Sequence, residues 1–277
     1  MKTWNNIIAA STAKYGIACG TLGSDNLLEY NSHDVVETAS TIKILIMICA
    51  FDLVEKGKLS LDTTITIEIE DVDDKGSGLI KAFKLPQSLS LYNAIIMMMS
   101  VSDNTATNGI IRLLGDKTIN EYSRNIGLVN TRLRMAPINF VEDYDMEKYP
   151  IGRTTPLEMY RLLTGLLNGS LLNQDNTILA SKVMQSIRNS LIARLIPVSE
   201  ENNINSFGSK TGTLIWETAI KVGECGYIKI KDGPTYVFSI YSKGNFADND
   251  YYRIDLPILL EFSDVAKLLY EQMAENS

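Results

Sequence analysis

The stretch that decides the fold reads Ser40-Thr41-Ile42-Lys43-Ile44-Leu45-Ile46-Met47-Ile48-Cys49-Ala50-Phe51. From Ile42 to Glu55 apolar residues occupy nearly every side of a helical pattern, which is typical of a helix buried all round. Its longest apolar run, 44–51, is much shorter than the roughly 20 residues that span a bilayer. We therefore expect a central helix in a globular core, with Ser40 at its start.

The segments before and after this helix predict an antiparallel sheet. Residues 15–22 and 27–30 alternate around a Gly23-Ser24-Asp25-Asn26 turn, which is typical of a β-hairpin, and a short helix is expected over 4–13. Further strands are expected over 210–216, 219–230 and 235–241. A final helix is expected over 256–273, with apolar residues on a single stripe.

Between the two strand regions the patterns are helical. The predicted helices cover 91–99, 105–114, 117–125, 156–167 and 176–186, and Pro156 suits a first helical turn. This order predicts an α+β fold of the α/β/α sandwich type, with an antiparallel sheet from both chain ends flanked by helices. The expected division is an α/β subdomain from 1–56 and 193–277, an inserted all-α subdomain over 57–192, and an active site in the cleft between them.

Composition excludes several classes of protein. The 277 residues carry 26 Lys and Arg against 33 Asp and Glu, and this net charge of −7 disfavours binding to nucleic acid or to anionic membranes. His33 is the single histidine, so a multi-histidine metal centre is impossible and a hydrolytic base is expected to be another residue. Three widely spaced cysteines predict buried thiols without a disulfide framework.

Ser40 and Lys43 form an S-x-x-K pair at the start of the buried helix. Residues three apart on a helix share a face, so the amine is expected beside the hydroxyl. Burial favours the neutral amine, which can take a proton from serine. The same spacing at Ser11 and Lys14 shows that the motif alone is also compatible with a helix cap and a surface lysine.

Two further motifs carry polar side chains. Ser102-Asp103-Asn104 lies between two predicted helices, where it could equally be a helix cap, and Ser24-Asp25-Asn26 repeats it in a turn. Lys210-Thr211-Gly212-Thr213 begins a strand, where Lys210 and Thr211 offer a cation and a hydroxyl to a carboxylate. Gly212 is expected to leave room for a ligand backbone, although a solvated lysine and a turn glycine would give the same pattern.

The order of the three motifs, with separations of 102 − 40 = 62 and 210 − 102 = 108 residues, resembles the class A β-lactamases and the related penicillin-recognising serine hydrolases over essentially the whole chain. The resemblance implies that Ser40 is the acylated nucleophile, Lys43 its base, and Ser102 a proton relay near Lys210. It also implies that Asn104 binds a substrate amide, that Thr211 holds the carboxylate, and that the Ser40 and Thr213 amides form the oxyanion hole. No metal or cofactor is implied.

One part of the family pattern is missing. Class A β-lactamases carry E-x-x-L-N in the Ω-loop, whose glutamate activates the water that hydrolyses the acyl-enzyme, and residues 135–147 do not contain it. Glu142 is the nearest candidate base, but the sequence favours a surface carboxylate in an acidic loop. Lys221 is a candidate for the arginine that in the family helps to bind the substrate carboxylate.

The sequence therefore predicts a serine β-lactamase that opens a β-lactam amide through a Ser40 acyl-enzyme. The alternatives are a D-Ala-D-Ala peptidase, amidase or esterase with slow deacylation, or a noncatalytic β-lactam-binding domain. The expected partner is a small molecule, not nucleic acid or a membrane, and the expected state is a monomer. Residues 1–6 lack the features of a secretory signal, so a cytoplasmic location is expected unless an export signal has been removed.

Overall fold

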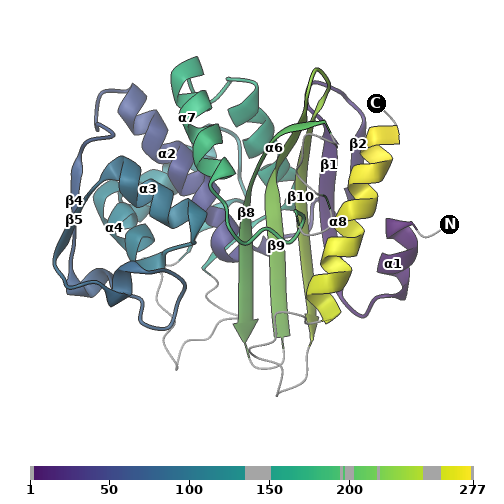
Figure 1. Ribbon diagram of the computed structural model, residues 1–277, viewed down its shortest axis with the longest axis horizontal. Coiled ribbons are helices and arrows are strands. Elements are labelled where there is room, and N and C mark those ends of the chain that lie inside the picture. The colour runs from purple at the N-terminus through teal and green to yellow at the C-terminus, as the bar shows by residue number, and fades with distance from the viewer. Residues whose placement is uncertain are drawn as a thin grey trace.

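A five-stranded antiparallel sheet forms the middle layer of the computed structural model (Figure 1). The residues described are 3–134, 151–193, 196, 203–216, 219–245 and 257–275. The strand order is β2-β1-β10-β9-β8. Their bounds are β1 Lys14–Thr21, β2 Leu27–Tyr30, β8 Ile204–Trp216, β9 Ala219–Ile230 and β10 Thr235–Asn245. Because β1 pairs with β10 along its whole length, the sheet unites both ends of the chain, as predicted.

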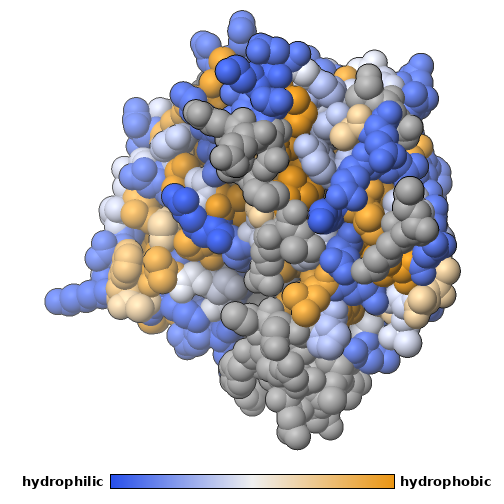
Figure 2. Space-filling view, turned by 45° about the vertical axis from the view of Figure 1, so that its right-hand side comes forward, coloured by the Kyte–Doolittle hydropathy of each residue, from blue (hydrophilic) through white to orange (hydrophobic). Residues whose placement is uncertain are grey.

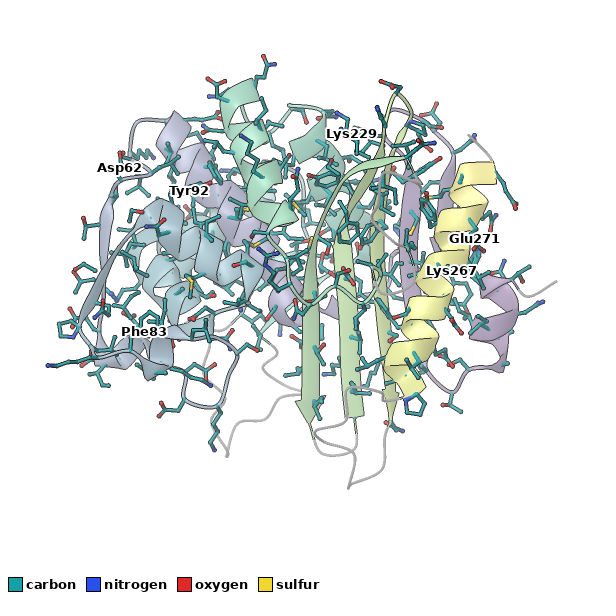
Figure 3. The ribbon with its side chains drawn as sticks, viewed as in Figure 1. Asp62, Phe83, Tyr92, Lys229, Lys267 and Glu271 are labelled. Carbon is teal, nitrogen blue, oxygen red and sulfur yellow. The ribbon has the colours of Figure 1, made fainter. Side chains whose placement is uncertain are left out.

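Helices cover both faces of this sheet. On one face lie α1 (Trp4–Ala10) and α8 (Pro257–Glu275), which share a core with the sheet through Trp4, Phe262 and Leu269. On the outer side of α8, Lys267 and Glu271 form an exposed ion pair at 3.8 Å (Figure 3). On the opposite face lie α2 (Lys43–Glu55) and α6 (Pro156–Leu167). The predicted α/β/α sandwich is thus confirmed.

The segment from 57 to 192 is mostly helical. It contains α3 (Leu91–Ser100), α4 (Asn104–Leu114), α5 (Asp116–Asn125) and α7 (Gln174–Gln185), all within two residues of their predicted bounds. It also contains strands β4 (Thr64–Ile67) and β5 (Gln87–Ser90), which pair with each other, so the expectation of a purely helical segment is wrong in this respect. The division of the chain into two subdomains stays a prediction.

Three short strands lie beside the start of α2. They are β3 (Val36–Glu37), β6 (Arg132–Leu133) and β7 (Gly152–Thr154), in the order β3-β7-β6. Short 3₁₀ helices occur at η1 (Ala39–Ile42), η2 (Ile69–Asp71) and η3 (Ile80–Ala82). Since η1 leads directly from β3 into α2, the residues that precede the buried helix are held by a small sheet of their own.

The helix that decides the fold is buried as predicted. Every residue of α2 from Lys43 to Phe51 is at most 1% exposed. Cys19, Cys49 and Cys225 are buried free thiols, which confirms the expectation from their spacing. None of the helices among the described residues is both long and apolar enough to cross a membrane. On the face drawn in Figure 2, hydrophilic residues surround small separate groups of apolar ones.

Candidate active site

Lys43 is the first residue of α2, and its side chain is fully buried. Its Nζ lies 2.8 Å from the carbonyl oxygen of Ser102, 3.0 Å from Ser102 Oγ and 2.6 Å from Asn104 Oδ1. The structure thus brings together the S-x-x-K and S-D-N motifs through one amine, although they are about 60 residues apart in the chain.

Burial holds the pKa of the Lys43 amine well below its usual value. Desolvation is the largest cause, and the charge of Lys210 lowers the pKa further, whereas Asp103 and Asp73 raise it. A lysine with a lowered pKa is neutral in a larger fraction of molecules, and only the neutral amine has a lone pair that can accept a proton. The environment of Lys43 therefore suits a general base.

Ser40 lies in η1, one turn before Lys43, and is partly exposed. In a 3₁₀ helix residues i and i+3 lie one above the other, so the two side chains leave the turn on the same side. The residue before it, Ala39, has a φ of +43°, a conformation that costs energy in residues with a β-carbon. The Ser40 hydroxyl makes no hydrogen bond to any described residue, which leaves it available to a substrate.

Ser102 and its neighbours are fixed by Asp103. This carboxylate caps α4 by accepting a hydrogen bond from Ala106 N, and it also accepts hydrogen bonds from Leu79 N and Ile80 N. Ser102 itself has a φ of +58°, which is uncommon for serine and is sustained by the contacts on either side of it. The helix-cap interpretation thus holds for Asp103, while Ser102 and Asn104 contact Lys43.

Lys210 lies on β8 and is fully buried. Desolvation lowers the pKa of its amine to about 7, against an opposing effect of Glu224 on the neighbouring strand. Its Nζ donates a hydrogen bond to the carbonyl oxygen of Thr211, and the Thr211 hydroxyl donates one to Asn189 Oδ1 at 3.1 Å. Thr213 is exposed. Within the described sheet β8 is an edge strand, so its outer side has no partner strand there.

Gly212 has a different role from the one expected. A β-carbon at this position would lie 2.7 Å from Thr38 O, 2.9 Å from Ser40 N and 3.0 Å from Thr41 N. The space left by the missing side chain is therefore filled by the chain's own backbone and not by a ligand. Gly212 allows β8 to pack directly against the turn that carries Ser40.

Two buried carboxylates with several hydrogen bonds, one of them beside the site, were not predicted. Asp73 accepts a hydrogen bond from Asn104 Nδ2 at 2.6 Å, although it is 31 residues away in the chain. Glu158 accepts hydrogen bonds from the backbone amides of Asn130 and Thr131, just before β6. Asp73 stands in an acidic stretch, Glu70-Asp71-Val72-Asp73-Asp74, which looks like an ordinary solvated loop, so no local signal marked it.

The candidate deacylation base, Glu142, lies outside the described residues. The described residues on either side of it are held together, because β6 pairs with β7 and Arg134 N bonds to Ile151 O.

Lys221 does not lie with Thr211. Thr211 lies opposite Glu224 where β8 pairs with β9, and Lys221, three residues before Glu224, points to the other face of β9. On that face Lys221 is close to Glu37. The expectation that Lys221 assists in binding the substrate carboxylate gains no support.

A cavity of about 870 Å³ lies apart from these residues. It is lined by residues of β1, β3, β7, β9 and β10, among them Glu37, Arg134, Arg153 and Lys221, and by none of the proposed catalytic side chains. Burial raises the pKa of the Glu37 carboxyl in this cavity to about 7. In the described part of the chain, no group of three or more His, Cys, Asp or Glu side chains is placed to hold a metal ion.

Known proteins share both the sequence pattern and the fold. The β-lactamase CARB-4 of Pseudomonas aeruginosa is 26% identical over 226 residues, which cover 77% of this chain and 75% of that protein. The β-lactamase of Sphaerobacter thermophilus has a TM-score of 0.81 at 24% identity, covering 98% of this chain and 94% of its own.

A second kind of protein shares the fold. The L158E mutant of PBP-A, solved as an acyl-enzyme complex with penicillin G, has a TM-score of 0.78 at 21% identity, covering 98% of this chain and 94% of its own. The sequence model described as the β-lactamase enzyme family matches residues 1–272. This match spans nearly the whole chain and all three motifs, so the chain belongs to the β-lactamase enzyme family of serine hydrolases.

Proposed function

We propose that this hydrolase opens the amide bond of β-lactams through an acyl-enzyme on Ser40. One observation carries the proposal: the buried Lys43 amine follows Ser40 by one turn and lies 3.0 Å from Ser102 Oγ. A base with a lowered pKa beside a hydroxyl is the arrangement that activates a serine nucleophile without histidine. His33, the single histidine, is exposed in the loop between β2 and β3.

In the first step Ser40 Oγ attacks the carbonyl carbon of the β-lactam, and its proton passes to neutral Lys43. The negative charge that develops on the carbonyl oxygen is stabilised by the backbone N–H groups of Ser40 and Thr213. Ser102 then donates its proton to the ring nitrogen as the C–N bond breaks, and Lys43 returns a proton to Ser102. The products of this step are the Ser40 ester and a free ring amine.

Lys210, Thr211 and Asn104 bind the substrate in this proposal. The Lys210 amine and the Thr211 hydroxyl, from consecutive residues of β8, are the proposed cation and hydrogen-bond donor for the substrate carboxylate. The Thr211 hydroxyl donates to Asn189 Oδ1, so it must exchange this partner for the substrate. Asn104 Oδ1 already accepts one hydrogen bond from Lys43 and has a second lone pair, which can accept from a substrate amide.

Deacylation separates the two candidate functions. A β-lactamase needs a base that activates water, and Glu142 is the proposed one. The second candidate, a penicillin-binding peptidase, forms the same acyl-enzyme but releases it slowly when the acyl group comes from a β-lactam, and PBP-A shares the fold of this chain. Loss of one positioned acid–base group slows a step by about 10²–10⁴-fold, so the difference is large enough to measure.

The test is the intact mass of the protein at intervals after mixing with benzylpenicillin. We expect an adduct on the wild type, none on Ser40→Ala, and an unchanged adduct on Ser11→Ala, which alters the second S-x-x-K sequence. Decay of the adduct within minutes, slowed by Glu142→Gln, supports the β-lactamase, whereas an adduct that persists for hours supports the peptidase. An adduct that forms on Ser40→Ala contradicts both.

A further inference from the structure

The carboxylate of Asp73 is buried behind the proposed catalytic residues. Only 3% of this residue is exposed. Its Oδ2 accepts a hydrogen bond from Asn104 Nδ2 at 2.6 Å, and its Oδ1 accepts one from Gly76 N at 2.9 Å. Its backbone N–H donates to Thr105 Oγ1 at 3.2 Å. The first two bonds fix the carboxylate, and the third fixes the main chain that carries it.

The hydrogen bonds from Asp73 through Asn104 to Lys43 have only one consistent direction. An ionised carboxylate can only accept, so it requires the amide nitrogen of Asn104, and the amide oxygen must then face Lys43. The opposite orientation of the amide would place Nδ2 against the amine of Lys43 and Oδ1 against the carboxylate. That would leave two donors facing each other and two acceptors facing each other, with no room for water at 2.6 Å.

This orientation also determines where the lone pair of Lys43 points. A neutral amine has two N–H groups, and two of its three neighbours, the Ser102 carbonyl oxygen and Asn104 Oδ1, can only accept. They take both hydrogens, so the lone pair is left for a serine hydroxyl, that of Ser40 one turn earlier during acylation or that of Ser102 at 3.0 Å. The amine is thereby arranged to exchange a proton with a serine hydroxyl.

We propose that Asp73 is a positioning residue of the hydrolase, which orients Asn104 and through it the base Lys43. The inference rests on the proposed function of Ser40 and Lys43 and adds a residue that the three motifs do not contain. Asp73 acts in two ways. Its acceptor atoms fix the amide of Asn104, and its negative charge raises the pKa of the Lys43 amine.

The electrostatic part of this role predicts a change in the pH profile. Three charged groups act on Lys43: Lys210 from β8, Asp103 from the turn before α4, and Asp73 from the loop before η3. Lys210 lowers the pKa of the Lys43 amine, and the two carboxylates raise it. Because acylation needs the neutral amine, its rate rises with pH through this pKa. Removing the charge of Asp73 should therefore move the rise to lower pH.

The experiment compares Asp73→Asn with Asp73→Ala. Asparagine keeps an acceptor for Asn104 Nδ2 but removes the charge, whereas alanine removes both. The readout is the single-turnover rate of acylation by a chromogenic cephalosporin between pH 5 and 10. Asp74→Asn, a change at the exposed neighbouring residue, is the matched control.

We expect Asp73→Asn to acylate at a rate near that of the wild type, with its pH limb shifted to lower pH. We expect Asp73→Ala to acylate at least about 10-fold more slowly at pH 7, because the base is no longer oriented. If Asp73→Ala does not fold, the pH limb of Asp73→Asn decides the question. If the rate for Asp73→Asn rises over the same pH range as that of the wild type, the proposed role of Asp73 is overturned. The proposed function still stands in that case, provided that Ser40 of the wild type is acylated. Absence of a wild-type adduct overturns both.

Discussion

Gly212 and Ser40 are in backbone contact across two elements: a β-carbon added to Gly212 would lie 2.9 Å from Ser40 N. The strand that carries Lys210 and the turn that carries the nucleophile therefore meet with no side chain between them. The distance between Ser40 and the amides of β8, on which an oxyanion hole depends, is set by this contact.

Gly212→Ala should damage the site more than the fold. The new methyl group meets backbone atoms of Thr38, Ser40 and Thr41, which cannot rotate away, so β8 and η1 must separate. Overpacking of this kind costs about 1–3 kcal/mol of stability. We expect acylation to fall by about 10²-fold, because a donor of the oxyanion hole is displaced. Thermal unfolding and acylation rates measure the two effects.

Gly23→Ala is the control for this variant. Its φ of +82° strains an alanine, but no atom lies within 4 Å of the new β-carbon. It should lose stability and keep its acylation rate. Equal rates for Gly212→Ala and the wild type would show that the close packing of β8 against η1 is not required.

Lys43→Met should abolish most of the acylation by β-lactams. Methionine has a similar length and keeps the apolar packing of α2, but it cannot accept the serine proton. We expect a loss of about 10²–10⁴-fold in the rate of acylation. Lys14→Met, the same change in the other S-x-x-K sequence, affects an exposed strand residue and should leave the rate unchanged. A rapid burst of product from Lys43→Met would contradict its role as the base.

Lys210 should make stability depend on pH. Burial lowers the pKa of its amine to about 7, so the folded protein binds fewer protons than the unfolded chain between about pH 7 and the ordinary lysine value of about 10.4. Its unfavourable contribution to stability is therefore complete below pH 7 and disappears as the pH rises through this window. Lys210→Met should stabilise the protein more at pH 6 than at pH 10, as measured by urea unfolding at both pH values. An equal effect at both would show that the amine is not titrating with a lowered pKa.

Glu158→Ala should destabilise the residues that lead into β6. The carboxylate accepts hydrogen bonds from the backbone and side-chain nitrogens of Asn130 and from the amide and hydroxyl of Thr131. Each buried donor left without a partner costs about 1–3 kcal/mol, so a total loss above about 3 kcal/mol is expected in thermal or denaturant unfolding. Glu121→Ala, on the exposed side of α5, should change stability by less than about 0.5 kcal/mol. A similar loss in both variants would contradict the structural role of Glu158.

The sequence predicted most of the architecture, because the hydrophobic patterns are long and have clear ends. Helix α6 has the predicted bounds, since Thr155 caps it and Pro156 begins it. The strands β4 and β5 were missed, although Thr64-Ile65-Thr66-Ile67 alternates, because four residues between helical segments give a weak pattern.

The contents of the site were predicted less completely than the fold. The catalytic motifs were found because S-x-x-K depends on local helix geometry. Asp73 and the contact of Gly212 depend on segments that meet only in the folded chain, and a sequence carries no local mark of such contacts.

The pairing of β1 with β10 has a consequence for how the molecule is made. Lys14 lies opposite Lys243, so β1 cannot pair with β10 until more than two hundred further residues have been synthesised. Ser40 and Lys43 leave the ribosome early, but β8, β9 and β10, which complete the sheet beneath them, arrive in the last third of the chain. A nascent or truncated chain that ends before β10 therefore has the nucleophile but not its surroundings. We therefore expect only chains that contain β10 to react with β-lactams. A β-lactam that labels Ser40 would mark only chains whose synthesis has passed β10.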